Sequence, residues 1–158
     1  MAEKIIDHPT LAKKLEALKG QGKKIVLADG CFDLLHVGHV RYLRAAKALG
    51  DLLVLALNSD ASIKRVKGEG RPLLPLEDRL GVLGAFEMVD FITSFEDDNV
   101  DPLLSQLRPQ IYAQRPGNPA KGDSFNGKVI TVKEGTDHSA DKLIQEILRK
   151  YGPLSEKP

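Results

Sequence analysis

IVLADGCFDLLHVGHV, residues 25–40, joins a continuous apolar run to a helical pattern through a glycine-containing turn. The apolar run at residues 25–28 is typical of a strand covered on both faces of a parallel sheet, and the strand is expected to end at Gly30. From Val37 to Leu49 apolar residues recur on one helical face, and Gly50 supplies a C-terminal stop. A strand that leads directly into a helix in this way predicts the first unit of an α/β fold.

The same alternation continues on both sides of this stretch. Leucines at helical spacing up to residue 18 predict a leading helix within residues 1–22. The patterns that follow predict strands at residues 52–57, 91–93, 111–113 and 129–132, and helices at residues 76–87, 100–107 and 139–150. This order predicts an α/β, Rossmann-like, doubly wound parallel sheet of about five strands, with ligands at the carboxyl ends of the strands.

Length and composition narrow the classes of protein. No linker-like stretch divides the 158 residues, so we expect one domain made of a leading helix (1–22), an α/β core (23–150) and a tail (151–158). The 23 basic and 22 acidic residues nearly cancel, which argues against nucleic acid as a partner but allows a small anionic ligand. Cys31 is the only cysteine, which excludes an internal disulfide. With no signal-peptide pattern and no apolar run near about 20 residues, we expect a cytoplasmic protein without a membrane segment.

Residues 30–39 carry the features of a phosphate site. Glycine lets the backbone approach a phosphate, and the N-terminus of the following helix offers unpaired N–H groups and positive potential. His36 and His39, three residues apart, fall on one side of the first helical turn. Donors aimed at a phosphoryl group stabilise the charge of its transition state, which is the main catalytic need in phosphoryl transfer. Two histidines at this spacing would by themselves fit a helix cap equally well, so the interpretation depends on the whole string.

GCFDLLHVGH at residues 30–39 resembles GxFDxxHxGH, the signature of the cytidylyltransferase-like family with its HxGH nucleotidyltransferase fold. The resemblance continues through residues 52–79, which include NSDAS at 58–62 and VKGEGRP at 66–72 and are similar to bacterial heptose 1-phosphate adenylyltransferases. Members of that group are often fused behind a heptose kinase. The resemblance implies an enzyme that transfers AMP from ATP to a heptose 1-phosphate by direct in-line attack, with release of pyrophosphate, in lipopolysaccharide biosynthesis.

The same resemblance assigns roles to individual residues. The implied catalytic residues, which face the reacting phosphates, are His36, His39 and Lys67. The implied nucleotide-binding residues are Gly30, Cys31, Phe32, Asp33, Gly38, Arg79, Arg115 and Ser139. The residues implied to border the second substrate are Asn58, Asp60 and Arg71. No protein metal site is expected, because Mg²⁺ would be carried by the triphosphate, and a homodimer is an expectation from the family alone.

The resemblance breaks at two places in the last third of the chain. Gln114-Arg115-Pro116-Gly117 stands where the heptose enzymes carry Lys-Gly-Gly-Asp, so Arg115 is left to replace the lost cation. His138-Ser139-Ala140-Asp141 stands where the family has serine and threonine residues at a helix N-terminus. Ser139 still supplies a hydroxyl, but Asp141 would bring a carboxylate towards the phosphates, which is unfavourable.

Two alternatives therefore remain beside the adenylyltransferase. The HxGH signature also serves cytidylyltransferases that act on a polyol phosphate such as glycerol 3-phosphate. A nucleotide-binding module that has lost catalysis would also be compatible with the two altered segments. Turnover separates the enzymes from the module, and the preference for ATP or CTP separates the two enzymes.

Overall fold

Strand β1 (Ile25–Gly30) lies at the centre of a five-stranded parallel sheet in the computed structural model, which describes residues 4–117, 125–133 and 139–152. The other strands are β2 (Leu52–Asn58), β3 (Phe91–Phe95), β4 (Ile111–Gln114) and β5 (Lys128–Thr131). Their order in the sheet is β3-β2-β1-β4-β5, and every pair is parallel. The chain winds outward from β1 in one direction and then in the other, so the doubly wound sheet predicted from the sequence is confirmed.

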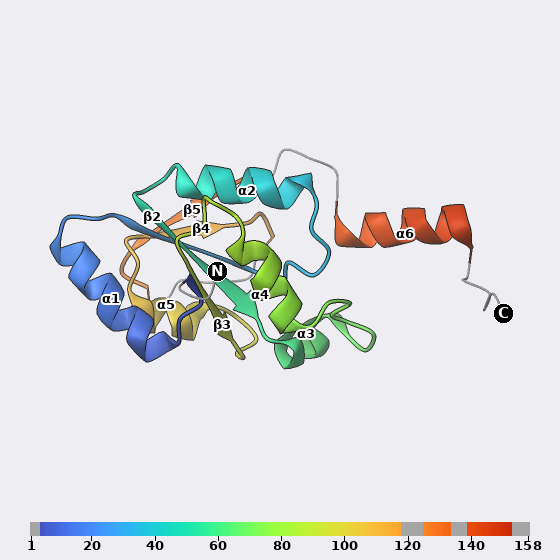
Figure 1. Ribbon diagram of the computed structural model, residues 1–158, viewed down its shortest axis with the longest axis horizontal. Coiled ribbons are helices and arrows are strands. Elements are labelled where there is room, and N and C mark those ends of the chain that lie inside the picture. Colours follow the sequence, from blue (N-terminus) through green and yellow to red (C-terminus); the bar gives the residue numbers. More distant parts are fainter. Residues whose placement is uncertain (1–3, 118–124, 134–138, 153–158) are drawn as a thin grey trace.

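Helices cover both faces of the sheet (Figure 1). On one face lie α2 (Val37–Lys47) and α4 (Leu76–Gly84), whose apolar residues share a core cluster with β1 and β2. On the other face lie α1 (His8–Gly20) and α5 (Asp101–Leu107). Every residue of β1 is buried, which accounts for the continuous apolar run in the sequence. The two faces are therefore held by separate hydrophobic clusters, with β1 between them.

Leu11 and Leu15 anchor α1 to the second cluster. Both side chains are fully buried, as the leucine spacing predicts, and full burial of a leucine stabilises the fold by about 2 kcal/mol. Asp7 caps the helix, because its carboxylate accepts a hydrogen bond of 2.9 Å from the Thr10 N–H. The leading helix expected within residues 1–22 is thus part of the packed fold.

Four elements differ from the sequence prediction by more than one residue. α2 ends at Lys47, two residues before the predicted end. The segment after β2 forms a short helix, α3 (Asp60–Lys67), that the apolar pattern does not mark because only Ser62 and Ile63 are buried. α4 ends at Gly84, three residues early, because the chain turns there and packs Phe86 and Met88 against the core. β3 extends to Phe95.

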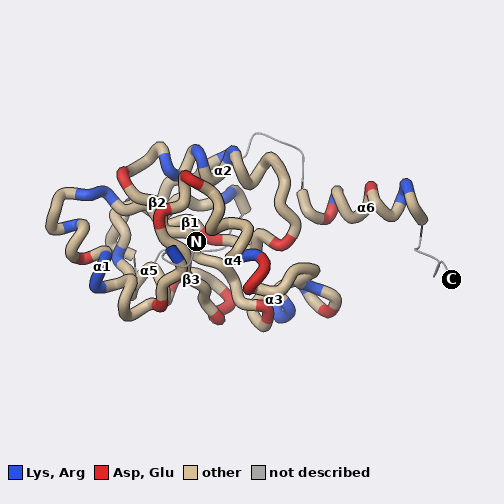
Figure 2. Tube along the Cα trace, in the orientation of Figure 1, with Lys and Arg blue, Asp and Glu red and all other residues tan. Residues whose placement is uncertain are grey.

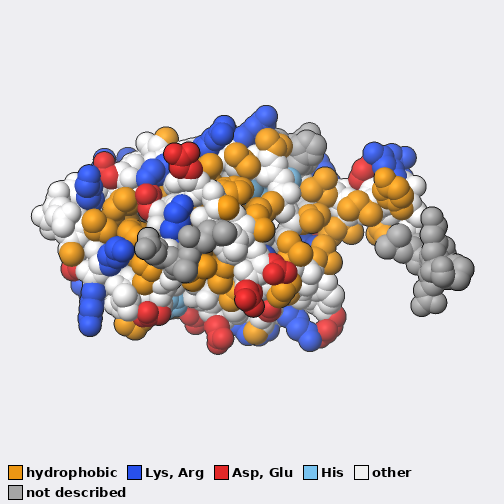
Figure 3. All heavy atoms as spheres, in the orientation of Figure 1, with side chains coloured by type: hydrophobic (Ala, Val, Ile, Leu, Met, Phe, Trp, Pro, Cys, Tyr) orange, Lys and Arg blue, Asp and Glu red, His pale blue; other side chains and the backbone are white. Residues whose placement is uncertain are grey.

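α6 (Ala140–Tyr151) departs most from expectation. It forms where a helix is predicted, but it projects beyond the sheet instead of covering it (Figure 1), and none of its residues is buried. Figure 3 shows hydrophobic side chains on α6 and along its junction with the body. Charges are spread along the whole chain (Figure 2), in keeping with a formal net charge of +1. Ile147, Leu148 and Tyr151 of α6 are exposed, and we call these three residues the apolar stripe of α6.

Candidate active site

A small polar cavity lies at the carboxyl end of β1, beside the point where the strand order reverses between β1 and β4. We call it the HVGH pocket, and its volume is about 120 Å³. Its lining residues come from five segments of the chain: Cys31, Phe32, Asp33, His36, His39, Lys67, Arg71, Arg115, Ser139, Ala140 and Asp141. Ligands of doubly wound sheets bind at such a reversal, so the cavity lies where the fold predicts a site.

His36 and His39 meet at the N-terminus of α2. The His36 ring caps the helix, because its Nδ1 accepts a hydrogen bond of 3.1 Å from the Gly38 N–H. The His39 Nδ1 in turn accepts from the His36 N–H at 3.3 Å, and the two ring centroids are 3.9 Å apart. An Nδ1 that accepts must be unprotonated, so the hydrogen of each neutral ring lies on Nε2. The sequence prediction that both histidines face one site is consistent with this geometry.

Burial holds the His39 ring neutral. Desolvation, with smaller contributions from the neighbouring His36, Arg115 and Lys67 side chains, lowers the pKa of His39 from 6.5 to about 3. The residue is 5% exposed, and its ring packs on Phe32 with ring centroids 5.0 Å apart. At neutral pH His39 is therefore a hydrogen-bond donor through Nε2 and not a cation.

This neutral histidine makes stability depend on pH. Between pH 6.5 and 3 the unfolded chain binds a proton that the folded ring does not, so the free energy of unfolding should fall as the pH drops through that window. We expect His39→Gln to lose less stability than the wild type between about pH 7.5 and about pH 5, as measured by urea unfolding. Equal losses in both proteins would show that another group carries the dependence.

Phe32 and Gly30 shape the floor of the pocket together. Phe32 has a φ of +49°, in the left-handed region that non-glycine residues seldom adopt. A Cβ added to Gly30 would lie only 2.9 Å from Phe32 Cε2, so glycine is required for the ring to lie where it does. Gly30 and Gly38 do not line the pocket; they position the residues that do.

Asp33 binds residues 71–74, which follow α3, at the edge of the pocket. Its Oδ1 accepts hydrogen bonds from the Leu73 and Leu74 N–H groups at 2.8 and 2.9 Å, and its Oδ2 lies 3.2 Å from Arg71 Nη1. Asp33 is 3% exposed, so its carboxylate is committed to these contacts. The structure therefore brings Arg71 to the pocket wall, beside the residues predicted to bind nucleotide.

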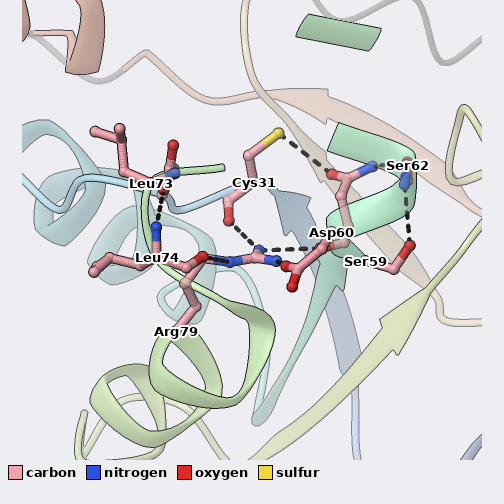
Figure 4. A network of polar contacts seen from close by, with 9 residues as sticks. Cys31, Ser59, Asp60, Ser62, Leu73, Leu74 and Arg79 are labelled. Atoms are coloured by element: carbon pink, nitrogen blue, oxygen red, sulfur yellow. Dashed lines mark hydrogen bonds and ion pairs between the residues drawn. The ribbon is translucent and has the colours of Figure 1, made fainter. Parts of the chain in front are cut away.

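Arg79 does not line the HVGH pocket. Figure 4 shows its side chain among the segments that it contacts. Its guanidinium is fully buried and donates to the carbonyl oxygens of Cys31, Asn58 and Leu74 and to the Asp60 carboxylate, at 2.6 to 3.0 Å. The sequence predicts that Arg79 holds the phosphates that leave, and this role stays a prediction. In the structure the side chain ties together the loops that follow β1 and β2.

Asn58 and Asp60 belong to the same network. The Asn58 amide donates to Ser62 Oγ at 3.0 Å and accepts a weak contact from Cys31 Sγ at 3.7 Å. Asp60 pairs with Arg79 at 2.7 Å. Neither lines the HVGH pocket, so the structure does not place the two predicted substrate-binding residues beside the histidines. Their described contacts are with Cys31, Ser62 and Arg79, and of these Cys31 lines the pocket.

Two cations form a further wall of the HVGH pocket. They are Lys67, the last residue of α3, and Arg115, which follows β4. The Arg115 guanidinium stacks over the Phe32 and Tyr42 rings, 5.9 and 5.8 Å from their centroids, in cation–π geometry. Arg115 thus supplies a positive charge at this wall, as the sequence suggests. Burial raises the pKa of the Cys31 thiol, which disfavours the thiolate form that a nucleophile requires.

The N-terminus of α6 forms the remaining wall. Ser139 caps the helix by accepting a hydrogen bond of 3.1 Å from the Lys142 N–H. Asp141 Oδ1 lies 3.3 Å from Arg71 Nη2, so the carboxylate expected near the phosphates does reach the pocket. His138 lies outside the described residues.

Sequence reasoning missed Tyr42 and the Leu73–Leu74 backbone. Tyr42 is buried, donates a hydrogen bond of 2.6 Å to the Ala113 carbonyl and supports Arg115. Its place on the apolar face of α2 was a usable signal. No sequence signal indicates the roles of the Leu73 and Leu74 N–H groups, because every residue except proline carries the same backbone donor.

A family model described as cytidylyltransferase-like matches residues 27–153. The chain belongs to the cytidylyltransferase-like family. The matched residues include the GCFDLLHVGH string, Lys67 and Arg115. The enzyme class predicted from the sequence, a nucleotidyltransferase, is therefore confirmed.

Relatives of this cytidylyltransferase-like chain include proteins named "Bifunctional protein HldE". Those of Pelobacter propionicus and Geobacter sulfurreducens are each 42% identical, over 155 and 156 residues that make up 94% of this chain. The aligned region is 32% of each relative, so the chain spans about a third of the length of the relatives it matches. Whatever the other two thirds of those relatives do is not part of this similarity.

Two solved structures are similar to this chain in fold. A lipopolysaccharide core biosynthesis protein from Thermoplasma volcanium superposes with a TM-score of 0.63 at 22% identity, over 70% of this chain and 97% of that chain. A pantoate-beta-alanine ligase from Francisella tularensis gives 0.61 at 14% identity, over 81% of this chain and 66% of that chain. At these identities the likeness concerns the fold alone.

The described residues contain neither a cluster of metal-ligand side chains nor a helix that could span a membrane. No group of three or more histidine, cysteine, aspartate or glutamate side chains is placed to hold a metal ion within residues 4–117, 125–133 and 139–152. No helix in the same part of the chain is long and apolar enough to cross a membrane.

Proposed function

We propose that this chain transfers AMP from ATP to a sugar phosphate of the heptose 1-phosphate type. A phosphate oxygen of the sugar attacks the α-phosphorus, the bond to the β-phosphate breaks in line, and pyrophosphate leaves. The observation that carries the proposal is the convergence of two imidazoles, Lys67 and Arg115 on one pocket at the end of β1. A transition state that spreads charge over several phosphate oxygens requires donors from several directions.

Each group has a distinct part in this reaction. The neutral His39 donates through Nε2 to a phosphate oxygen in a buried setting, where a hydrogen bond is stronger than in water. Lys67 and Arg115 neutralise the charge that builds up on the departing phosphates. No side chain becomes covalently modified, because the acceptor phosphate is itself the nucleophile.

Mg²⁺ enters the proposal as part of the triphosphate. Mg²⁺ is commonly held by phosphate oxygens and water with only one or two protein carboxylates, so a dedicated cage of side chains is not needed. The Asp33 and Asp141 carboxylates lie near the pocket but are paired with Arg71.

The acceptor is inferred from sequence similarity. Residues 52–79 resemble heptose 1-phosphate adenylyltransferases, and relatives at 42% identity match 94% of the chain. The altered segment Gln114–Gly117 at the end of β4 favours keeping a second candidate, a cytidylyltransferase that acts on a polyol phosphate. The carboxylate of Asp141 in the pocket favours keeping a third candidate, a nucleotide-binding module without turnover.

Pyrophosphate release separates these candidates. The protein is supplied with Mg-ATP or Mg-CTP, each with heptose 1-phosphate or glycerol 3-phosphate, and pyrophosphate is followed with a coupled assay. We expect release with ATP and heptose 1-phosphate. Release only with CTP and glycerol 3-phosphate would favour the second candidate, and nucleotide binding without release in any combination would favour the third.

A further inference from the structure

The Arg71 side chain lies between two carboxylates at the rim of the HVGH pocket. Its Nη1 is 3.2 Å from Asp33 Oδ2, and its Nη2 is 3.3 Å from Asp141 Oδ1. Asp33 is almost fully buried and holds two backbone N–H groups, so it is a fixed part of the wall. The Asp141 side chain is 75% exposed and comes from α6, far along the chain. Only one of the two carboxylates is therefore free to leave.

The pocket is too small for a nucleotide while α6 lies where it does. Its volume is about 120 Å³, whereas sites for small organic ligands span roughly 300–1,000 Å³. Ser139, Ala140 and Asp141 form the wall that α6 contributes. A carboxylate at this wall also repels a phosphate chain that approaches the same cations. Both volume and charge require this wall to retreat before phosphates enter.

α6 is also the wall that moves at least cost. The residues that follow β1, β2 and β4 extend from the buried sheet, while none of the residues of α6 is buried. On its apolar stripe Ile147, Leu148 and Tyr151 are 48%, 53% and 71% exposed. Displacing the helix therefore breaks the Asp141–Arg71 pair but disrupts no hydrophobic core.

We propose that Asp141 is a built-in competitor of the nucleotide phosphates. In the nucleotide-free protein its carboxylate occupies Arg71 and holds α6 over the pocket. A phosphate chain that enters takes over Arg71, and Asp141 leaves with the N-terminus of α6. This rests on the proposed function only in requiring that a phosphate chain enters the HVGH pocket.

Calorimetric titration with inorganic pyrophosphate, ATP and adenosine, in EDTA, tests the proposal on the full chain. For Asp141→Asn we expect the Kd of pyrophosphate and the Kd of ATP to fall together by up to about fivefold, the range for an exposed ion pair, and no change for adenosine. Glu146→Gln is the matched control, because it removes a carboxylate of the same helix that pairs with Arg149 and Lys150 instead. It should leave all three values unchanged.

A double-mutant cycle identifies the cation. In an Arg71→Met background Asp141→Asn should no longer tighten pyrophosphate binding, since the contested group is gone. Weaker or unchanged pyrophosphate binding by Asp141→Asn in the otherwise wild-type chain would overturn the competitor role. A wild type that binds neither pyrophosphate nor ATP would instead contradict the proposed function.

Discussion

Replacing His39 by alanine is expected to lower kcat about a thousandfold and to change the Kd of ATP by much less than that. Loss of one preorganised donor to a developing negative charge costs about 10²–10³ in rate. His39 is held neutral by burial, with its Nδ1 engaged by the His36 N–H, so Nε2 is fixed as the donor towards the pocket. Steady-state kinetics together with ATP binding measures both effects.

His8→Ala is the matched control for this change. His8 lies at the start of α1, and its Nε2 is 2.6 Å from the Ser94 carbonyl oxygen, outside the HVGH pocket. We expect its kcat to stay close to that of the wild type. Equal losses in the two variants would show that the His39 effect is one of folding. A change in KM alone would assign His39 to ground-state binding.

The second large effect is expected on stability, at Arg79. Arg79→Met should lower the free energy of unfolding by about 3–5 kcal/mol, because it removes the partner of three carbonyl groups and leaves Asp60 without its cation. In a chain of this size such a loss lowers Tm by about 10 °C. Thermal and urea unfolding followed by circular dichroism measure the two quantities.

Arg149→Met supplies the comparison. Arg149 on α6 pairs with Glu146 at 2.7 Å, but its side chain is 68% exposed. An exposed pair contributes about 0–1 kcal/mol, so we expect little change in Tm. A loss for Arg79→Met no larger than that for Arg149→Met would contradict the role of Arg79 as the tie between the loops after β1 and β2.

The sequence predicted the sheet because its strands have one clear signature. β1 and β2 are buried on both faces and read as continuous apolar runs, while the helices between them have a single apolar face. The residues of α6 also show an apolar face at helical spacing, and this periodicity predicts a helix there. Periodicity shows that a helix has an apolar face but not what covers it, so the projection of α6 could not be predicted.

Site residues could be predicted from the sequence where they belong to one short motif that follows a strand. His36, His39 and Asp33 lie within ten residues of the end of β1, and the structure brings all three to the pocket. Arg79 was assigned to phosphate because it is a cation in a matching stretch. Its spacing from Leu76 and Leu83 puts it on the core face of α4, which is the signal that would have indicated burial.

Transfer of the α-phosphorus of ATP to a sugar phosphate is the reaction proposed for the HVGH pocket, and an isotope label follows it directly. The protein is incubated with heptose 1-phosphate and Mg-ATP labelled on the α-phosphorus, and the sugar product is separated from nucleotide and pyrophosphate. We predict that the label appears in the sugar product at the rate of pyrophosphate release, and that His39→Ala lowers both rates about a thousandfold. A sugar product that acquires label only from the γ-phosphorus, or no labelled sugar product while ATP binds, would contradict the proposed adenylyl transfer.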